Sequence, residues 1–203
     1  GNTLVCLIVF DRMGFATVTN LFIANIALTD LLMGLFCIPV VLVSDFLLLD
    51  WPFGSFMCKF ISFAQSVFIM CTVYSLISIS VDRYIAITYP LYPKLTRTRC
   101  RRIIVCLWLL SVMFSSPIFI EMNIHQTCFQ RDPHEKQLYT QITCQSGGLP
   151  DSLQTVYNIV MLTVMYLIPL LLLSVAYIAL GWQLHRNRAP GEAHSKRDAQ
   201  IKK

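Results

Sequence analysis

Long apolar stretches separated by short polar ones dominate the sequence. Four of them run for 18 residues or more with at most one charge: Leu21 to Ser44, Phe60 to Val81, Ile103 to Ile120 and Ser152 to Leu184. A helix needs about 20 mostly apolar residues to cross the hydrocarbon core of a bilayer. The residue alternation of a membrane β-barrel is absent, and backbone in lipid must satisfy its own hydrogen bonds. The pattern therefore predicts membrane-spanning helices.

A shorter apolar stretch opens the chain. Residues 1–10 are too few to span a bilayer, so we interpret them as the inner half of a helix. The predicted fold is an all-α transmembrane helical bundle, one domain over residues 1–203, with spans at about 1–10, 18–44, 56–87, 101–121 and 152–186. Pro190 and Gly191 predict a break after the last span, and 195–203 a charged helical restart.

Composition supports a lipid environment. The chain is 56% hydrophobic and 13% charged, where a soluble domain has about a quarter charged residues. These figures exclude disorder, a coiled coil, collagen and a basic nucleic-acid-binding protein. We expect no nucleic acid among the partners.

The net charge of +5 is unevenly distributed along the chain. Of the 16 basic residues, 13 fall in residues 11–17, 82–102 and 184–203. Since Lys and Arg concentrate in cytoplasmic connections, these segments predict the cytoplasmic face. We therefore expect a multi-pass plasma membrane protein. The start of the chain and the connection 121–151 lie outside, and the tail 187–203 lies in the cytoplasm.

Ionisable residues at membrane depth are costly and usually functional. Asp30 is the acid nearest the middle of a predicted span; it either fixes packing inside the bundle or belongs to a water-filled cation site. Asp82, Arg83 and Tyr84 close the third span, where adjacent charges can also serve as a headgroup anchor. The sequence alone does not decide whether Asp30 is structural or functional, nor whether Asp82, Arg83 and Tyr84 are.

The cysteines divide into two groups. Cys58, Cys128 and Cys144 lie on the predicted outer side, where oxidation is permitted. A bridge from Cys58 to either of the other two would hold the long loop over the third helix. The remaining cysteines read as small buried residues, with Cys100, near the inner membrane edge, also a candidate for palmitoylation.

Several short motifs then occur in a fixed order. They are Gly1-Asn2, Leu28-Thr29-Asp30, Trp51-Pro52-Phe53-Gly54 before Cys58, Asp82-Arg83-Tyr84, Trp108, and Pro169 with Tyr177. In this order the chain resembles the rhodopsin-like (class A) G-protein-coupled receptors over essentially its whole length. The sixth- and seventh-helix motifs of that family have no match, so the resemblance implies about five of its seven helices. We expect a first helix that is partial and a domain truncated at both ends.

The resemblance also implies roles for individual residues. Asp30 with Asn2 and Thr72 resembles the allosteric sodium site, although the family usually has Ser where Thr72 stands. No other metal and no cofactor are expected. Cys144 is our candidate partner for Cys58, with Cys128 as the alternative.

Coupling to a heterotrimeric G protein is implied at the cytoplasmic end. The family pattern has Arg83 held by Asp82 at rest, and Arg83 and Tyr177 forming the cavity for the Gα C-terminus on activation. Leu91 would be an apolar contact with Gα, and we place Tyr84 and Pro169 in the same activation set. Arrestin and membrane lipid are the other partners expected.

Two features indicate the ligand class: the residue type at position 65 and the length of the fourth connection. Gln65 stands where amine receptors of the family have an aspartate, and an amide cannot neutralise an ammonium group. A fourth connection of about 30 residues has room for the β-hairpin of peptide receptors. Several short sequence segments resemble those of the RFamide, RYamide, orexin, neuropeptide Y and tachykinin receptors, so we expect a basic, amidated peptide. Gln65 would meet its amidated end, and Glu121 or Asp45 its arginine, unless both acids are merely solvated loop charges.

Other classes remain as alternatives. A receptor of the same family with a non-peptide ligand is one, and a small membrane transporter is another, although no inverted repeat is visible. The histidines are scattered without metal-ligand spacing, so we expect no enzyme.

Overall fold

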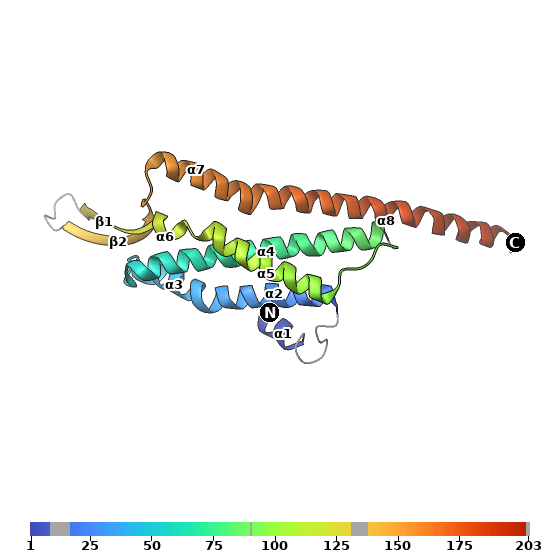
Figure 1. Cartoon of the computed structure of the whole chain (residues 1–203), viewed down its shortest axis with the longest axis horizontal. Helices are drawn as coiled ribbons and strands as arrows, with labels where there is room; N and C mark the ends of the chain where they lie inside the picture. Colours follow the sequence, from blue (N-terminus) through green and yellow to red (C-terminus); the bar gives the residue numbers. More distant parts are fainter. Residues whose placement is uncertain (9–16, 90, 131–137, 202–203) are drawn as a thin grey trace.

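The computed structural model describes residues 1–8, 17–89, 91–130 and 138–201. Long helices run side by side, and a β-hairpin projects from one end of the bundle (Figure 1). We call this the hairpin end, and the opposite end, where residues 97–102 lie, the basic end. In chain order the elements are α1 (Asn2–Ile8), α2 (Val18–Leu32), η2 (Met33–Cys37), α3 (Ile38–Leu42), η3 (Val43–Leu48), α4 (Gly54–Thr88), α5 (Arg97–Ser115), α6 (Ile118–Glu121), β1 (Met122–Gln130), β2 (Leu138–Ser146), α7 (Asp151–Leu162), η4 (Thr163–Leu167) and α8 (Ile168–Ile201).

Within the described residues, four helices are long and apolar enough to cross a membrane: Val18–Leu48, Gly54–Thr88, Arg97–Glu121 and Asp151–Gln183. They lie where the four long spans were predicted, with ends that differ by a few residues. The helix at the start of the chain covers Asn2–Ile8, and most of the first predicted connection lies outside the described residues.

The break predicted at Pro190 and Gly191 is wrong. α8 continues through both residues to Ile201 (Figure 1). An internal proline removes one helical hydrogen bond and a glycine lowers helix propensity, but neither has to end a helix. The helical restart predicted at 195–203 is part of the same helix as far as Ile201.

Two membrane prolines are accommodated by wider helical turns. η2 precedes Pro39 and η4 precedes Pro169, and proline cannot donate the usual helical bond. The amide of Ile38 instead bonds the carbonyl of Met33, five residues back, and the amide of Ile168 bonds that of Thr163. Such π-helical turns redistribute the freed backbone groups along the helix.

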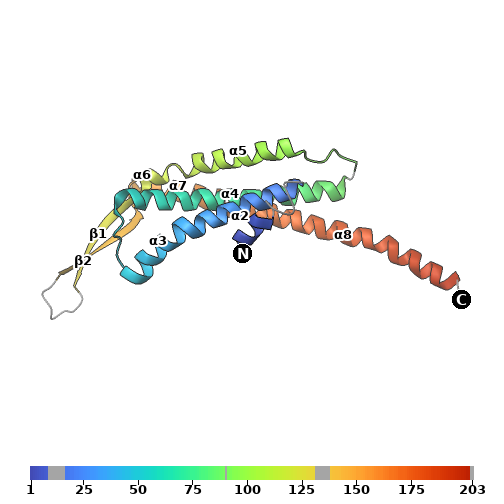
Figure 2. The same ribbon diagram turned by 90° about the horizontal axis from the view of Figure 1, so that it is seen from below.

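α4 forms the centre of the bundle and packs against α2, α5 and α8. One apolar cluster joins α2 to α5 through Leu21, Phe22 and Cys100, and a second joins α4 to η2 through Cys37, Ile61 and Ala64. α5 lies along one edge of the molecule when viewed from below (Figure 2). Cys100 is fully buried, so it is not accessible for the palmitoylation suggested by its position at the membrane edge.

Strands β1 and β2 form an antiparallel hairpin, with Met122 paired to Ser146 and Gln130 to Leu138. The hairpin expected in the fourth connection is confirmed. Among the described residues these two strands form the one sheet, and the regular structure is otherwise helical.

Candidate functional site

A disulfide joins the hairpin to the third span. Cys58 in the first turns of α4 is bonded to Cys144 in β2, with 5.6 Å between the Cα atoms and a sequence separation of 86. Of the two pairings that the sequence left open, the structure has the one with Cys144. Cys128 is a free, exposed thiol.

The hairpin is also hydrogen-bonded to the segment between η3 and α4. The amide of Trp51 donates to the carbonyl of Ile142 at 2.8 Å, and the amide of Ile142 donates to Asp50 Oδ1 at 2.6 Å. Gln141 Nε2 donates to the carbonyl of Leu49 at 2.6 Å. Sequence reasoning identified the segment as a motif but missed this role. β2 is therefore held on two sides, by a covalent bond to α4 and by hydrogen bonds to residues 49–51.

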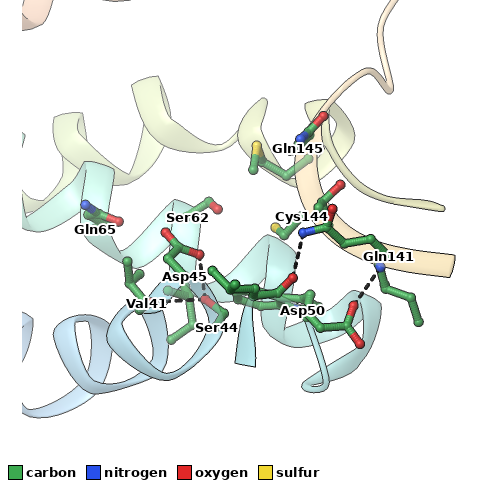
Figure 3. A pocket seen from close by; sticks show the side chains of 15 residues that line it. Val41, Ser44, Asp45, Asp50, Ser62, Gln65, Gln141, Cys144 and Gln145 are labelled. Carbon is green, nitrogen blue, oxygen red and sulfur yellow. Dashed lines mark hydrogen bonds between the residues drawn. The ribbon is translucent and has the colours of Figure 1, made fainter. Parts of the chain in front are cut away.

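A cavity of about 490 Å³ lies beneath β2, between η3 and the outer part of α4. Gln65 and Asp45 both line it, as does Ser62 one turn before Gln65 (Figure 3). Asp45 Oδ1 accepts a hydrogen bond from Ser44 Oγ at 2.9 Å, and the exposed carboxylate keeps free acceptor capacity. The polar walls can hydrogen-bond a peptide backbone or amide, and the carboxylates of Asp45 and Asp50 make one side of the cavity acidic.

Glu121, the third predicted ligand contact, does not line this cavity. It ends α6 with 5% of its surface exposed, so it is not a solvated loop charge. Its backbone carbonyl accepts hydrogen bonds from the amides of Gly147 and Gly148 at 3.0 and 2.9 Å. A side chain at Gly148 would collide with the carbonyl of Ile120, so the close approach requires glycine. Glu121 therefore belongs to the junction between the hairpin and the bundle.

The acid at membrane depth has a polar partner. Asn2 Nδ2 donates to Asp30 Oδ2 at 3.0 Å, which joins α1 to α2. Thr72 does not bond Asp30 directly: its hydroxyl lies 2.7 Å from that of Thr29, the preceding residue on α2. Carboxylate and hydroxyl oxygens are ligands of the kind that a hard cation such as Na⁺ prefers. Among the described residues, no cluster of three His, Cys, Asp or Glu residues suits a metal ion.

A buried asparagine connects three helices. Asn25 on α2 accepts from Trp108 Nε1 on α5 at 2.9 Å and donates to Ser75 Oγ on α4 at 3.0 Å. Its amide also lies 3.4 Å from Cys71 Sγ. Sequence reasoning named Trp108 as a motif residue but missed Asn25. An uncharged polar residue inside an apolar run was the available signal.

At the basic end, Arg83 has a partner other than the expected one. Its guanidinium donates to Thr19 Oγ1 at the start of α2. No ion pair between Arg83 and Asp82 is present among the described residues, so the expected resting contact is not observed. Asp82 instead lines a separate cavity beneath residues 92–95.

The remaining predicted coupling residues are spread along the bundle. Leu91, 99% exposed, follows Pro90 in the connection after α4, and Tyr177 on α8 is also exposed. Tyr84 is half-buried near the end of α4, whereas Pro169 is buried at the start of α8. The structure thus places Arg83, Tyr84 and Leu91 at one end and Pro169 in the interior of the bundle.

Comparison with known proteins gives the family. The model of the family 7 transmembrane receptor (rhodopsin family) matches residues 1–203. The chain belongs to the rhodopsin family of 7 transmembrane receptors. It is therefore a multi-pass membrane protein, and the resemblance drawn from its motifs is confirmed.

Relatives of this rhodopsin-family chain are receptors named for peptides. It is 35% identical over 192 residues to neuropeptide FF receptor 2 of Mus musculus, covering 93% of the chain and 46% of the relative. It is 33% identical over 208 residues to the RYamide receptor of Drosophila melanogaster, covering 99% and 42%. It is 35% identical over 186 residues to a QRFP-like peptide receptor of Branchiostoma floridae, covering 91% and 47%. The chain spans a little under half the length of each.

Proposed function

We propose that the chain is the ligand-binding and coupling part of a neuropeptide receptor that signals to a heterotrimeric G protein. The observation that carries the proposal is the cavity under the disulfide-anchored hairpin, which brings Gln65 and Asp45 together. The named relatives, receptors for neuropeptide FF, RYamide and QRFP-like peptides, support a peptide as the ligand. A non-peptide ligand or a transporter has no comparable support, and neither has an enzyme.

The ligand proposed is a basic peptide with an amidated end. Gln65 offers both an amide donor and an acceptor to a terminal amide, and Asp45 a carboxylate to an arginine. Asp50 adds to the negative potential of the same cavity, although its Oδ1 is engaged by Ile142. The burial of Glu121 beside the hairpin makes it a positioning residue in this proposal, since it lies away from the cavity.

The proposed orientation puts the hairpin end outside the cell and the basic end in the cytoplasm. Basic residues gather in 82–102 and the tail, as the positive-inside rule requires. Peptide binding would then bias a two-state bundle whose cytoplasmic face, including Arg83, Tyr84, Leu91 and Tyr177, contacts the Gα C-terminus. Arrestin would use the same face. Sodium at Asp30, with Asn2 and Thr72 nearby, would favour the resting state.

We also propose that these residues act within a longer seven-helix receptor, because the relatives are about twice as long. Sequencing the transcript on both sides of residues 1–203 tests this point. Calcium and cAMP responses of cells expressing the receptor, challenged with a library of amidated neuropeptides, test the function. A peptide that activates the wild type and loses potency with both Gln65→Ala and Asp45→Asn is expected. Activation only by non-peptide ligands, or by no ligand of the library, would contradict the proposal.

A further inference from the structure

Leu49, the residue that ends η3, has an unusual backbone conformation. Its φ is 53° and its ψ is 25°, in the left-handed region. In the part of the chain that the structure describes, it is the one residue other than glycine with a positive φ. Helices often end in this conformation, but usually with glycine, because a Cβ atom strains the left-handed backbone. A leucine at this position therefore lowers stability relative to a glycine.

The strained conformation is held by the hairpin. Gln141 Nε2 of β2 donates to the carbonyl of Leu49 at 2.6 Å, and Ile142 is hydrogen-bonded to both of the next two residues. Such strain persists only where the surrounding contacts fix the backbone, and it is typical of sites that bind ligands. The contacts of β2 with residues 49–51 therefore fix the backbone of Leu49 before any ligand binds.

The side chain of Leu49 is not used to pack the part of the bundle that the structure describes. It is 65% exposed and belongs to neither of the two apolar clusters. Leu49 lies instead at the cavity beneath β2, whose lining it shares with Asp45, Asp50 and Gln65. Because a glycine would end the helix without strain, what the leucine adds is an apolar contact for the molecule that fills the cavity.

Three residues of the cavity follow one another toward the hairpin end. Gln65 lies farthest from that end, two turns of α4 beyond the disulfide at Cys58, and Asp45 lies on η3 across the cavity (Figure 3). Leu49 follows Asp45 by one helical turn, which is roughly 6 Å. Side chains two residues apart in an extended peptide lie on the same side, about 7 Å from each other. A peptide with its amidated end at Gln65 and its arginine at Asp45 therefore brings the second residue before that arginine to Leu49.

We propose that Leu49 is a specificity-determining residue of the peptide site, and that it contacts an apolar side chain two residues before the arginine of the ligand. This inference rests on the proposed function and adds one requirement to it, besides the amidated end at Gln65 and the arginine at Asp45. The residue between the apolar one and the arginine points to the opposite side of an extended peptide. A leucine moved to that intermediate position should lose the contact with Leu49.

Competition between two synthetic pentapeptides tests the proposal on membranes of cells that express the receptor, with an N-terminally labelled copy of the first as tracer. The first, Gly-Leu-Ala-Arg-Phe-amide, has its leucine at the proposed position. The second, Gly-Ala-Leu-Arg-Phe-amide, has the same composition with the leucine moved by one residue. The wild type should bind the first about fivefold to tenfold more tightly than the second.

Three variants show whether Leu49 causes this preference. Leu49→Ala should abolish it, because the side chain that contacts the peptide leucine is removed. Leu49→Met keeps a large apolar side chain in the same strained conformation and should retain most of the preference. Leu48→Ala is the matched control: it removes an exposed leucine that does not line the cavity, and it should leave both affinities within about twofold of wild type.

A measurement without peptide tests the strain. Leu49→Gly should raise the melting temperature of the unliganded receptor by about 2–4 °C, because glycine adopts the left-handed conformation freely. Leu49→Ala keeps a Cβ atom and should give no such rise. Leu49→Gly should nevertheless lose the preference for the first peptide, which separates the effect of the leucine on stability from its effect on binding.

Equal binding of the two peptides by the wild type, or a preference that survives Leu49→Ala, would overturn the proposal. So would an equal loss of preference in Leu48→Ala. A melting temperature that falls in Leu49→Gly would mean that the leucine packs within the longer receptor, which overturns it as well. Failure of both peptides to bind the wild type would contradict the proposed function too, whereas binding that ignores the position of the leucine contradicts this inference alone.

Discussion

The indole of Trp108 donates to the side-chain carbonyl of Asn25 across 2.9 Å, and the amide of the same asparagine donates to Ser75. α5, α2 and α4 are therefore joined by one buried side chain, which is 7% exposed. A buried polar group that loses its partner costs about 1–3 kcal/mol. This relationship fixes how three helices meet and makes Asn25 a sensitive position.

Asn25→Ala should lower the stability of the bundle by about 2–3 kcal/mol, because Trp108 and Ser75 both lose a partner. Thermal unfolding in detergent, followed with a thiol-reactive dye, measures this directly, since Cys71 is fully buried beside Asn25 and reacts on opening. Trp108→Phe, which removes one of the bonds, should cost less. An Asn25→Ala melting temperature equal to that of the wild type would contradict the structural role.

Cys58→Ser should reduce surface expression or peptide binding, because β2 loses its covalent link to α4 and keeps, besides its pairing with β1, the hydrogen bonds to residues 49–51. Cys128→Ser is the matched control: it removes an exposed free thiol of the same hairpin and should leave both properties unchanged. Surface immunolabelling and radioligand binding measure the two properties. If the two variants behave alike, the bridge has no part in holding the hairpin.

Asp50→Ala should loosen the hairpin, since the Ile142 amide donates to its carboxylate at 2.6 Å. Hydrogen–deuterium exchange of a peptide covering residues 141–143 should speed up about tenfold or more, as expected for the loss of a charge-assisted bond worth about 1.5–3 kcal/mol. Asp45→Ala removes the neighbouring carboxylate of the cavity without touching β2 and should leave that exchange rate unchanged. Unaltered exchange with Asp50→Ala would rule out the anchor.

Arg83→Ala should abolish peptide-stimulated nucleotide exchange on Gα and leave peptide affinity largely intact, because Arg83 lies at the end of the bundle opposite the cavity. Thr19→Val keeps the shape of the side chain and removes the hydroxyl that Arg83 contacts. We expect it to raise peptide-independent exchange, since the arginine is released. Loss of exchange with Thr19→Val would mean that this contact supports the active state instead.

Asp30→Asn should remove the sodium dependence of thermal stability. Wild-type protein is expected to melt at a higher temperature in sodium chloride than in choline chloride, because a cation at the carboxylate lowers the cost of a charge at membrane depth. The amide introduced by this substitution can still accept a hydrogen bond from Asn2, so the variant keeps the link between α1 and α2. A sodium effect that survives the substitution places the ion elsewhere.

The spans could be predicted from the sequence because burial in hydrocarbon forbids charge over a fixed length. The ends of the helices could not be predicted as well, because long basic side chains within a helix can reach the membrane interface. α5, for example, begins at Arg97, four residues before its predicted start. Helix propensity also failed to predict the continuity of α8 through Pro190. These errors concern the boundaries of elements and leave their order intact.

Tertiary pairings were harder to predict than the spans. The cavity residues Gln65 and Asp45 came from a resemblance to known receptors, whereas the contact between Thr19 and Arg83 joins residues 64 apart and depends on where α2 crosses α4. Asn25 looked like one polar residue in an apolar run, and nothing in the pattern indicated three partners. Glu121 was predicted to be a ligand contact or a solvated loop charge, because the sequence does not show that Gly147 and Gly148, which follow β2, donate hydrogen bonds to its backbone carbonyl.

The wide turn at Thr163–Leu167 bears on how this chain is aligned with others. Tyr74 of α4 donates to the carbonyl of Val164 inside that turn at 2.9 Å, so the turn is fixed from outside the helix. A π-helical turn holds one residue more than the α-helical turn it replaces. A homologue without it would therefore need a one-residue gap within the fifth membrane helix before Pro169 and Tyr177 fall into matching columns.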